Sequence, residues 1–394
     1  MANIEFSPWP SFSQQEADKV SRVLLSNKVN YWTGTEGRNF EKEFAHFSCC
    51  EHAVAVTNGT LALDLALLTL GIDTGDEVIV TPRTFLASVS CIVNAGATPV
   101  FADVDNNSQN ITTDSIRAVL TPKSKAIICV HLAGWPCDMD SIMALANEQD
   151  LLVIEDCAQA HGAKYRGKSV GSFGHAAAWS FCQDKIMTTG GEGGMFTTND
   201  TSLWEKAWAY KDHGKSFDAV YHKDHPPGFR WLHESFGTNW RLTEMQSAIG
   251  RIQLQRMENW HKKRTDHALA ITKACEPFVD AGSLRVPLPL GDIEHAYYKF
   301  YVFVVPEALK FDWTRDRIVN EINQHGVPCF QGSCSEVYLE KAFDGTGFRP
   351  AERLPVAKTL GETSLMFLVH PTLTADEINQ TCEAIQMVMK LALK

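Results

Sequence analysis

The chain has 394 residues, of which 44% are hydrophobic and 21% are charged, a balance typical of globular proteins with a substantial core. Its formal net charge of -11 argues against binding to nucleic acid or to an anionic membrane surface, because both require a basic face. The longest apolar run, LALDLALLTL at residues 61–70, is too short and too interrupted to span a bilayer.

The N-terminal segment and the cysteines indicate where the protein works. MANIEFSPWP lacks the charged start and the apolar run of a secretory signal. The eleven cysteines include no C-x-x-C pair, so their spacing does not predict a zinc site, and we expect no metal. They are typical of reduced, mostly buried thiols, which favours a cytoplasmic location.

Short apolar segments alternate with amphipathic ones from about residue 55 to residue 200. The apolar segments predict strands at residues 77–80, 98–101, 126–131, 151–155, 176–181 and 194–197. The amphipathic segments predict helices at residues 61–70, 86–95, 113–120 and 139–149. This alternation, with short connections, predicts a mostly parallel sheet covered by helices on both faces.

The last third of the chain has a different pattern. It begins with a long, charged helical stretch at residues 243–275 and continues with a strand at 298–306 and helices at 313–325 and 375–392. We therefore expect two domains, a large one at residues 1–255 and a smaller C-terminal α+β domain at residues 256–394.

Thr57-Asn58-Gly59-Thr60 directly precedes the first predicted helix. A small turn at a helix N-terminus offers free backbone N–H groups to a phosphate. A plain helix cap by Asn58 or Thr60 explains the same residues, so the motif alone decides nothing. No G-x-x-x-x-G-K-[ST] or G-x-G-x-x-G motif follows a strand, which argues against nucleoside triphosphates and against a nicotinamide dehydrogenase.

Two further motifs follow predicted strands, where ligands bind in open α/β sheets. Glu155-Asp156 ends the apolar segment LLVIED, and an acid there can pair with a pyridinium nitrogen, a metal or a hydroxyl, or can simply cap a helix. Lys185 lies in SFCQDKIMTTGGEGG, between a predicted strand that ends near Ser180 and a glycine-rich run. Most isolated lysines are surface charges, but a lysine on such an open turn beside a pocket can lose its proton and form an imine.

Several motifs in order resemble the DegT/DnrJ/EryC1/StrS sugar aminotransferase family, a branch of the fold-type I pyridoxal 5'-phosphate (PLP) enzymes. They cover nearly the whole chain and include NGTLALDLAL, GDEVIVTPRTF, GATPVFADVD, EDCAQAHGA, SFCQDKIMTTGGEGG and GTNWRLTEMQSAIGRIQL. The resemblance implies an α/β fold with a mostly parallel, seven-stranded type of sheet in the large domain. It also implies a homodimer that transfers an amino group from L-glutamate to a sugar carbonyl.

The resemblance assigns a role to each matching residue. Lys185 is implied as the Schiff-base lysine and proton carrier, and Asp156 as the acid that keeps the pyridinium nitrogen of PLP protonated. The other implied cofactor contacts are the backbone of Gly59 and Thr60, the ring of Phe85, Gln159, the hydroxyl of Ser180, and Asn239 reaching into the neighbouring subunit. The last contact implies active sites shared between two subunits.

The sugar acceptor is suggested by finer similarities. SFCQDKIMTTGGEGG and GVPCFQGSCSEVYLEKAF most resemble the family members that make 8-amino-3,8-dideoxy-manno-octulosonate for lipopolysaccharide, from the C8 aldehyde of the 8-oxo sugar acid. A carboxylate-bearing acceptor needs a fixed cation, so Arg230, Arg241 and Lys215 are candidate substrate contacts, although a surface or fold-stabilising charge explains each of them as well. The family's commoner acceptor, a keto sugar linked to a nucleotide diphosphate, stays open.

Two departures from the family pattern bear on the substrate and leave the cofactor assignment intact. This chain has an added Gly190-Gly191 pair after the lysine. Many relatives carry a histidine near the position of Tyr298, where this chain reads Tyr297-Tyr298-Lys299. Lys185 argues against a sugar dehydratase of the same fold, because those relatives replace it with histidine. Lys185 and Asp156 together argue against a non-catalytic regulatory homologue.

Overall fold

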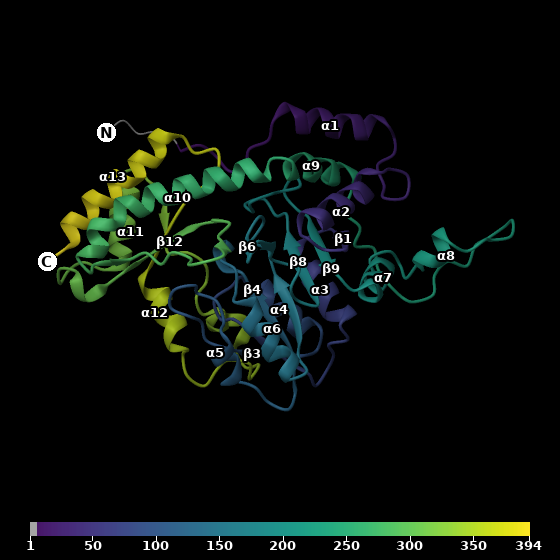
Figure 1. The fold of residues 1–394 in the computed structure, drawn as a ribbon, viewed down its shortest axis with the longest axis horizontal. Helices are drawn as coiled ribbons and strands as arrows, with labels where there is room; N and C mark the ends of the chain where they lie inside the picture. Colours follow the sequence, from purple (N-terminus) through teal and green to yellow (C-terminus); the bar gives the residue numbers. More distant parts are fainter. Residues whose placement is uncertain (1–5) are drawn as a thin grey trace.

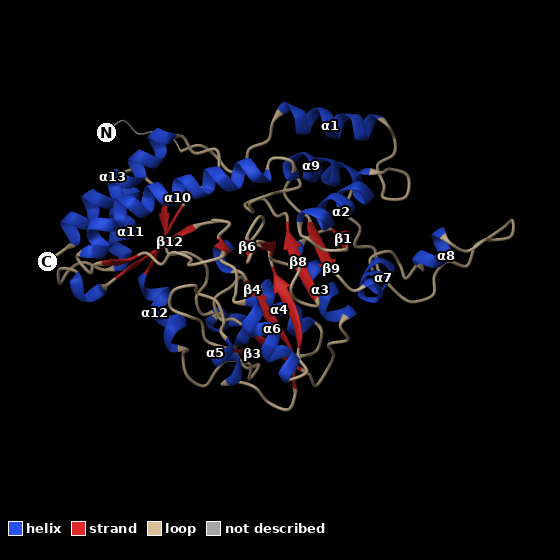
Figure 2. Ribbon diagram, in the orientation of Figure 1, coloured by secondary structure: helices blue, strands red, loops and turns tan. Residues whose placement is uncertain are grey.

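The computed structural model describes residues 6–394 and is built around two sheets. A seven-stranded sheet lies between two layers of helices, and a four-stranded sheet with its own helices lies beside it (Figure 1, Figure 2). Among residues 6–394, no helix combines the length and the apolar character needed to cross a membrane. The predicted α/β fold class is confirmed.

The seven-stranded sheet has the order β1-β9-β8-β5-β4-β2-β3 and is mostly parallel, with β9 antiparallel to both of its neighbours. Every residue of β8 and β9 is buried, and neither strand contains a charged residue. The strands are β1 (His52–Val56), β2 (Glu77–Val80), β3 (Thr98–Phe101), β4 (Ser124–Val130), β5 (Leu152–Asp156), β8 (Ala176–Ser180) and β9 (Gly194–Thr198).

The helices of this part follow the predicted alternation. Helix α3 packs against β8 and β9, and its position places its N-terminus at the carboxyl end of the sheet. The helices are α1 (Gln14–Leu25), α2 (Glu36–Phe47), α3 (Gly59–Thr69), α4 (Ala87–Asn94), α5 (Thr113–Arg117), α6 (Met139–Glu148) and α7 (Thr201–Tyr210).

The single helical stretch predicted at residues 243–275 is wrong, because it is two helices. Helix α9 (Glu244–Leu254) ends before Arg256, and helix α10 (Met257–Asp280) begins after it. The Arg256 guanidinium lies 2.7 Å from the Glu16 carboxylate of α1, so a contact distant in sequence holds the junction. No local sequence signal marks this break.

The four-stranded sheet is antiparallel, has the order β10-β12-β14-β13, and carries a separate hydrophobic core with α10, α11 and α13. Its predicted final helix is confirmed as α13 (Ala375–Ala392). The domain boundary at residues 255/256 stays a prediction, and the α9–α10 junction is consistent with it. The remaining elements are β10 (Leu284–Arg285), β12 (Phe300–Val304), α11 (Arg315–Gln324), β13 (Cys329–Phe330), α12 (Pro355–Thr363), β14 (Ser364–Phe367), and a small sheet of β6 (Lys164–Tyr165), β7 (Lys168–Ser169) and β11 (Ile293–Glu294).

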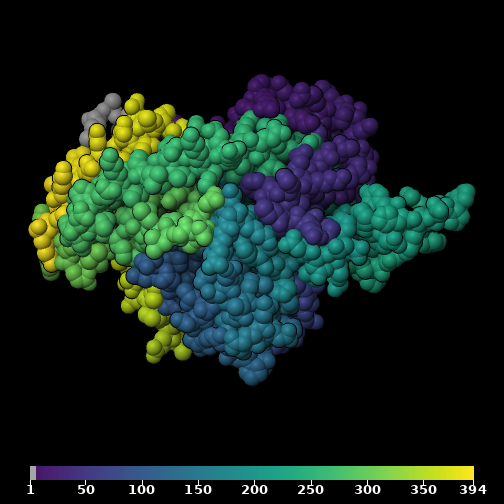
Figure 3. Space-filling model, in the orientation of Figure 1, coloured from purple at the N-terminus to yellow at the C-terminus, as the bar shows by residue number. Residues whose placement is uncertain are grey.

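An arm, residues 217–237, projects from the molecule beyond α7 (Figure 1, Figure 3). It contains the short helix α8 (Phe217–Tyr221) and exposes the aromatic side chains of Phe229, Trp231 and Phe236 to solvent. Its base is fixed by a backbone bridge between Lys215 and His233. Single exposed aromatics are common, but three on one projecting segment form an unusual exposed apolar surface.

Candidate active site

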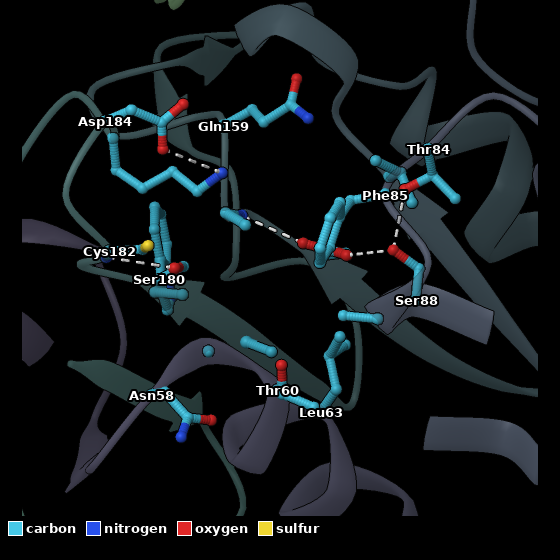
Figure 4. A pocket seen from close by; sticks show the side chains of 18 of the residues that line it. Asn58, Thr60, Leu63, Thr84, Phe85, Ser88, Gln159, Ser180, Cys182 and Asp184 are labelled. Atoms are coloured by element: carbon cyan, nitrogen blue, oxygen red, sulfur yellow. Dashed lines mark hydrogen bonds and ion pairs between the residues drawn. The ribbon is translucent and has the colours of Figure 1, made fainter. Parts of the chain in front are cut away.

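A cavity of about 790 Å³ lies at the carboxyl ends of β4, β5 and β8 (Figure 4). Val130, Asp156 and Ser180 are the last residues of these three strands, and all of them line the cavity. Seven of the eight predicted cofactor contacts come together here, namely Gly59, Thr60, Phe85, Asp156, Gln159, Ser180 and Lys185. A cavity at this edge of an α/β sheet is the expected place for a ligand.

Asp156 places a buried carboxylate in this cavity. The Ser88 hydroxyl donates to its Oδ2 at 2.7 Å, and the Ala158 N–H donates to its Oδ1 at 3.0 Å. Among residues 6–394, no lysine, arginine or histidine forms an ion pair with it. Since a buried carboxylate is costly without a cationic partner, Asp156 suits a positively charged group that a ligand supplies.

Glu155 points to the other side of the sheet, as alternation along a strand requires. Its carboxylate lies 3.0 Å from His131 Nε2 and accepts from the N–H groups of Gly171, Phe173 and Gly174 at 2.7–2.8 Å. Burial raises the pKa of Glu155, but His131 and these backbone donors together hold it below its ordinary value. His131, Glu155 and Cys157 lie close together, but hydrogen bonds already occupy both carboxylate oxygens of Glu155. We therefore interpret this cluster as a structural link rather than a metal site.

The N-terminus of α3 forms one wall of the cavity. The Asn58 side chain accepts a hydrogen bond from the Leu61 N–H at 2.9 Å, so the predicted helix cap is present. The N–H groups of Gly59 and Thr60 lie in the first turn and have no acceptor within the helix, which leaves them available to an anion. A Cβ atom at Gly59 would lie 2.6 Å from the Ser180 Cβ, so only glycine allows this close approach. The Asn58 side chain can therefore cap the helix while the N–H groups of Gly59 and Thr60 stay free to bind an anion.

Phe85 and Gln159 border the same cavity (Figure 4). The Phe85 side chain is 70% exposed, an unusual state for a phenylalanine unless a flat ligand covers it. The Gln159 Oε1 accepts from the Ala133 N–H at 2.8 Å, which leaves its amide N–H₂ group free for an acceptor. Together the two side chains suit an aromatic ring that carries a polar oxygen.

Lys185 lies on a turn, where its N–H donates to the Cys182 carbonyl at 3.1 Å. The indole N–H of Trp9 donates to the Lys185 carbonyl at 2.8 Å and fixes the turn from the other side. The Lys185 Nζ lies 3.9 Å from the Asp184 carboxylate and 5.2 Å from the centre of the Tyr298 ring. The amine therefore reaches into the cavity from a rigid backbone, as a nucleophile requires.

Comparison with known proteins decides the family. A model of the DegT/DnrJ/EryC1/StrS aminotransferase family matches residues 10–386. The chain belongs to this family.

Similar proteins match this sugar aminotransferase over nearly its whole length. The GDP-perosamine synthase of Escherichia coli O157:H7 is 34% identical over 380 residues, which cover 95% of this chain and 96% of that protein. A Streptomyces venezuelae transaminase for dTDP-3-amino-3,4,6-trideoxy-alpha-D-glucose is 32% identical over 367 residues, covering 93% and 90%. The X-ray structure of an aminotransferase from Psychrobacter cryohalolentis superposes with a TM-score of 0.97 at 67% identity, covering 98% and 99%.

The aminotransferase family and its solved structures are PLP-dependent, so PLP is the cofactor of this enzyme. The cavity fits PLP independently of the comparison. The uncompensated Asp156 carboxylate suits a pyridinium nitrogen, the exposed Phe85 ring suits the face of the pyridine, and the first turn of α3 suits a phosphate. Lys185 is the amine within the same cavity.

Four of the predicted site residues of this aminotransferase do not line the cavity of the single chain. Arg241 and Lys215 both form ion pairs with the buried Asp212 carboxylate, at 2.5 Å and 3.2 Å. Asn239 forms a backbone bridge with Asp212, and Arg230 lies exposed on the arm. The chain thus uses Arg241 and Lys215 to compensate a buried acid, and their roles as substrate contacts stay a prediction.

Sequence reasoning missed several side chains that line the cavity of this aminotransferase. Ser88 holds Asp156 and itself contacts Thr84 at 2.8 Å, and the Thr84-to-Ser88 spacing of four residues was an available signal. The position of Asp184 directly before Lys185 was another available signal. Tyr298 donates a hydrogen bond to Asp184 from a segment more than a hundred residues away, which no local pattern indicates.

Proposed function

We propose that this aminotransferase moves an amino group from L-glutamate to the carbonyl of a keto sugar linked to a nucleotide diphosphate. The observation that carries the proposal is the cavity in which Lys185 and the uncompensated Asp156 meet. Two of the similar proteins are named for GDP-linked and dTDP-linked sugars, which supports the same class of acceptor. Among the described residues that line the cavity, beside Asp156, Asp184 and Glu192, Lys185 is the only basic one, so a free sugar acid finds no guanidinium within the single chain.

Each residue has a defined task in this proposal. PLP, when bound, supplies an electron sink next to the carbon that loses or gains a proton. Lys185 would hold the cofactor and would serve as the base and acid that moves the proton at the substrate carbon. Asp156, fixed by Ser88, would keep the pyridinium nitrogen protonated, and the Phe85 ring would stack on the cofactor.

We infer that the active unit is a homodimer in which the arm of one chain reaches the cavity of its partner. Phe236 is 99% exposed, and Phe229 and Trp231 are also largely exposed, which supports burial of the arm by a second copy. Arg230 on the arm is an unpaired guanidinium among the described residues, so a partner's arm would add the cation that carboxylates of L-glutamate require. Asn239, at the base of the arm, is proposed to contact the phosphate of the partner's cofactor.

A second acceptor is the 8-oxo-3,8-dideoxy-manno-octulosonate aldehyde, which would place the enzyme in lipopolysaccharide synthesis in the cytoplasm. This acceptor is suggested only by the resemblance noted in the sequence, in SFCQDKIMTTGGEGG and GVPCFQGSCSEVYLEKAF, to family members that act on this acid. Arg241 and Lys215 are engaged with Asp212, so this acceptor would depend on Arg230 of a partner's arm for its carboxylate.

Single-turnover spectra distinguish the two acceptors. The enzyme is first converted to its pyridoxamine form with L-glutamate and freed from the donor, and then mixed with nucleotide-linked keto sugars or with the octulosonate. We expect nucleotide-linked keto sugars to restore the absorbance of the aldehyde cofactor faster. A faster return with the octulosonate would establish the sugar acid instead, and no return with any sugar would refute a sugar acceptor. Lys185→Ala serves as the inactive control.

Sedimentation tests the dimer with two exposed phenylalanines as a matched pair. Phe236→Ser removes an aromatic side chain from the arm, and Phe311→Ser removes a fully exposed one outside it. We expect only Phe236→Ser to weaken the dimer. A fully active monomer, or equal effects of the two changes, would contradict the role of the arm. Mixing inactive Lys185→Ala and Asn239→Ala chains should regenerate some activity if sites are shared.

A further inference from the structure

Asp184 is an acid of the cavity that the transamination scheme above does not use. Its side chain is 56% exposed, lines the cavity, and lies 3.9 Å from the Lys185 Nζ (Figure 4). Asp156, which accepts from the Ser88 hydroxyl, is the acid proposed to pair with the pyridinium nitrogen of the cofactor. An acid beside the reactive amine is a separate feature of the site.

Tyr298 fixes the position of this acid. The Tyr298 hydroxyl donates a hydrogen bond to the Asp184 Oδ2, and its backbone N–H donates to the Ala133 carbonyl at 2.9 Å. Tyr298 lies two residues before β12, so the second sheet of the molecule holds an acid on the Lys185 turn. The Tyr298 ring also lies 5.2 Å from the Lys185 Nζ, a distance that suits a cation over an aromatic face.

Other charged and titratable groups, some basic and some acidic, lie near Asp184 and Lys185. Burial raises the pKa of Asp184, but Lys185, the Tyr298 hydroxyl and Lys299 together lower it below its ordinary value. Burial lowers the pKa of Lys299 to about 8, and burial lowers that of His161 to about 3, so His161 is neutral near pH 7. The charged and titratable groups around Asp184 and Lys185 come from several elements. They are Tyr298 and Lys299 just before β12, Asp156 at the end of β5, His161 after β5, Arg264 on α10, and Glu192 in the cavity lining.

We propose that Asp184, held by the Tyr298 hydroxyl, is a positioning residue that stabilises positive charge on the Lys185 nitrogen and thereby sets the pH range in which Lys185 exchanges protons. The proposal rests on the proposed attachment of the cofactor to Lys185. Asp184 touches neither the cofactor nor the reacting carbon in this account. It acts by its charge at a fixed distance, whereas Lys299, with the opposite charge, acts against it.

The protonation of the nitrogen that joins Lys185 to the cofactor is visible in the absorbance spectrum, so the holoenzyme without substrates reports it directly. Asp184→Asn should lower the pH midpoint of this absorbance change by about one unit, because an opposite charge within 4–6 Å shifts a proton equilibrium by about 1–3 units. Tyr298→Phe, which removes only the hydroxyl, should lower the midpoint by less. Lys299→Met should raise it.

Two further variants separate charge from structure. Asp184→Glu keeps the carboxylate and should restore most of the midpoint. Glu192→Gln removes another acid of the cavity lining that forms no ion pair with Lys185 among the described residues, and should lower the midpoint by less than Asp184→Asn does. A purely structural role for Asp184 would change melting temperature without this ordered set of midpoints.

An unchanged midpoint in Asp184→Asn that still binds PLP would overturn the proposal. If that variant does not bind PLP, Tyr298→Phe decides, and an unchanged midpoint there overturns it. The titration needs no sugar, so a wrong acceptor class leaves this test intact. If the cofactor is attached elsewhere, reduction of the holoenzyme with borohydride and peptide mapping will place it on another lysine, which identifies that separate failure and also overturns the inference.

Discussion

Glu155→Gln and Asp156→Asn are expected to have opposite consequences, although the two acids are adjacent. Glu155 links β5 to residues 171–174, whereas Asp156 faces the cavity. Glu155→Gln should therefore destabilise the fold and leave the chemistry of the folded enzyme largely intact. Asp156→Asn should do the reverse, because an asparagine can still accept from the Ala158 N–H and contact the Ser88 hydroxyl.

The magnitude for Glu155→Gln follows from its partners. The carboxylate interacts with His131 and accepts from three backbone N–H groups, and an amide replaces one acceptor oxygen by a donor. A buried N–H that loses its acceptor costs about 1–3 kcal/mol, and a hydrogen bond to a charged group contributes about 1.5–3 kcal/mol. We expect a loss of about 3 kcal/mol. At about 2–4 °C per kcal/mol for a unit of about 150–250 residues, Tm should fall by roughly 6–12 °C.

Thermal denaturation followed by circular dichroism measures this change. Because the pKa of Glu155 is held below its ordinary value in the folded protein, its stabilisation is present above that ordinary value and is lost as the pH falls through the lowered one. The Tm difference between wild type and Glu155→Gln should therefore shrink in acid. A Glu155→Gln protein with the wild-type Tm at neutral pH would refute this reasoning. We expect Asp156→Asn to be slower by roughly 10²–10⁴-fold, so full activity in that variant would refute it as well.

Two other changes test the cofactor contacts. Phe85→Ala removes a ring that is 70% exposed, so the Tm of the apoenzyme should stay near wild type while PLP binds about tenfold more weakly, measured by fluorescence titration; unchanged affinity would exclude stacking. Ser88→Ala removes the donor to Asp156 and should lower kcat about tenfold. Ser90→Ala is the control, because within residues 6–394 the Ser90 hydroxyl donates only to the Ala87 carbonyl, at 3.4 Å. Equal kcat values in both variants would count against a role for Ser88.

The sheet and the centre of the site were predictable because burial leaves a direct mark on the sequence. Strands β2 and β3 have the predicted bounds, because each has a run of three apolar residues after its first, polar residue. Asp156 and Lys185 were singled out because polar residues at or beyond the ends of neighbouring strands meet at one edge of a sheet, and the family resemblance then implied their roles. Strand β1 was missed because the predicted alternation was started only near residue 55, inside the strand.

Contacts between distant segments explain what was not predictable. Asp184 acquires its place from Tyr298, and α10 begins where Arg256 reaches Glu16. Arg241 and Lys215 suggested substrate contacts as isolated cations, whereas in the structure both pair with Asp212. Such pairings depend on the packing of the whole chain. The two-residue strands β10 and β13 are too short to carry a periodic pattern.

Attachment of PLP to Lys185 is the central claim, and peptide mapping tests it most directly. Borohydride reduction of the purified holoenzyme fixes the cofactor to its lysine, and mass spectrometry of the digested protein then locates it. We predict that the modified peptide contains Lys185, and that Lys185→Ala neither shows the visible band nor yields a modified peptide. Cofactor found on another lysine, or a Lys185→Ala protein that keeps the band and cycles amino groups normally, would contradict the account.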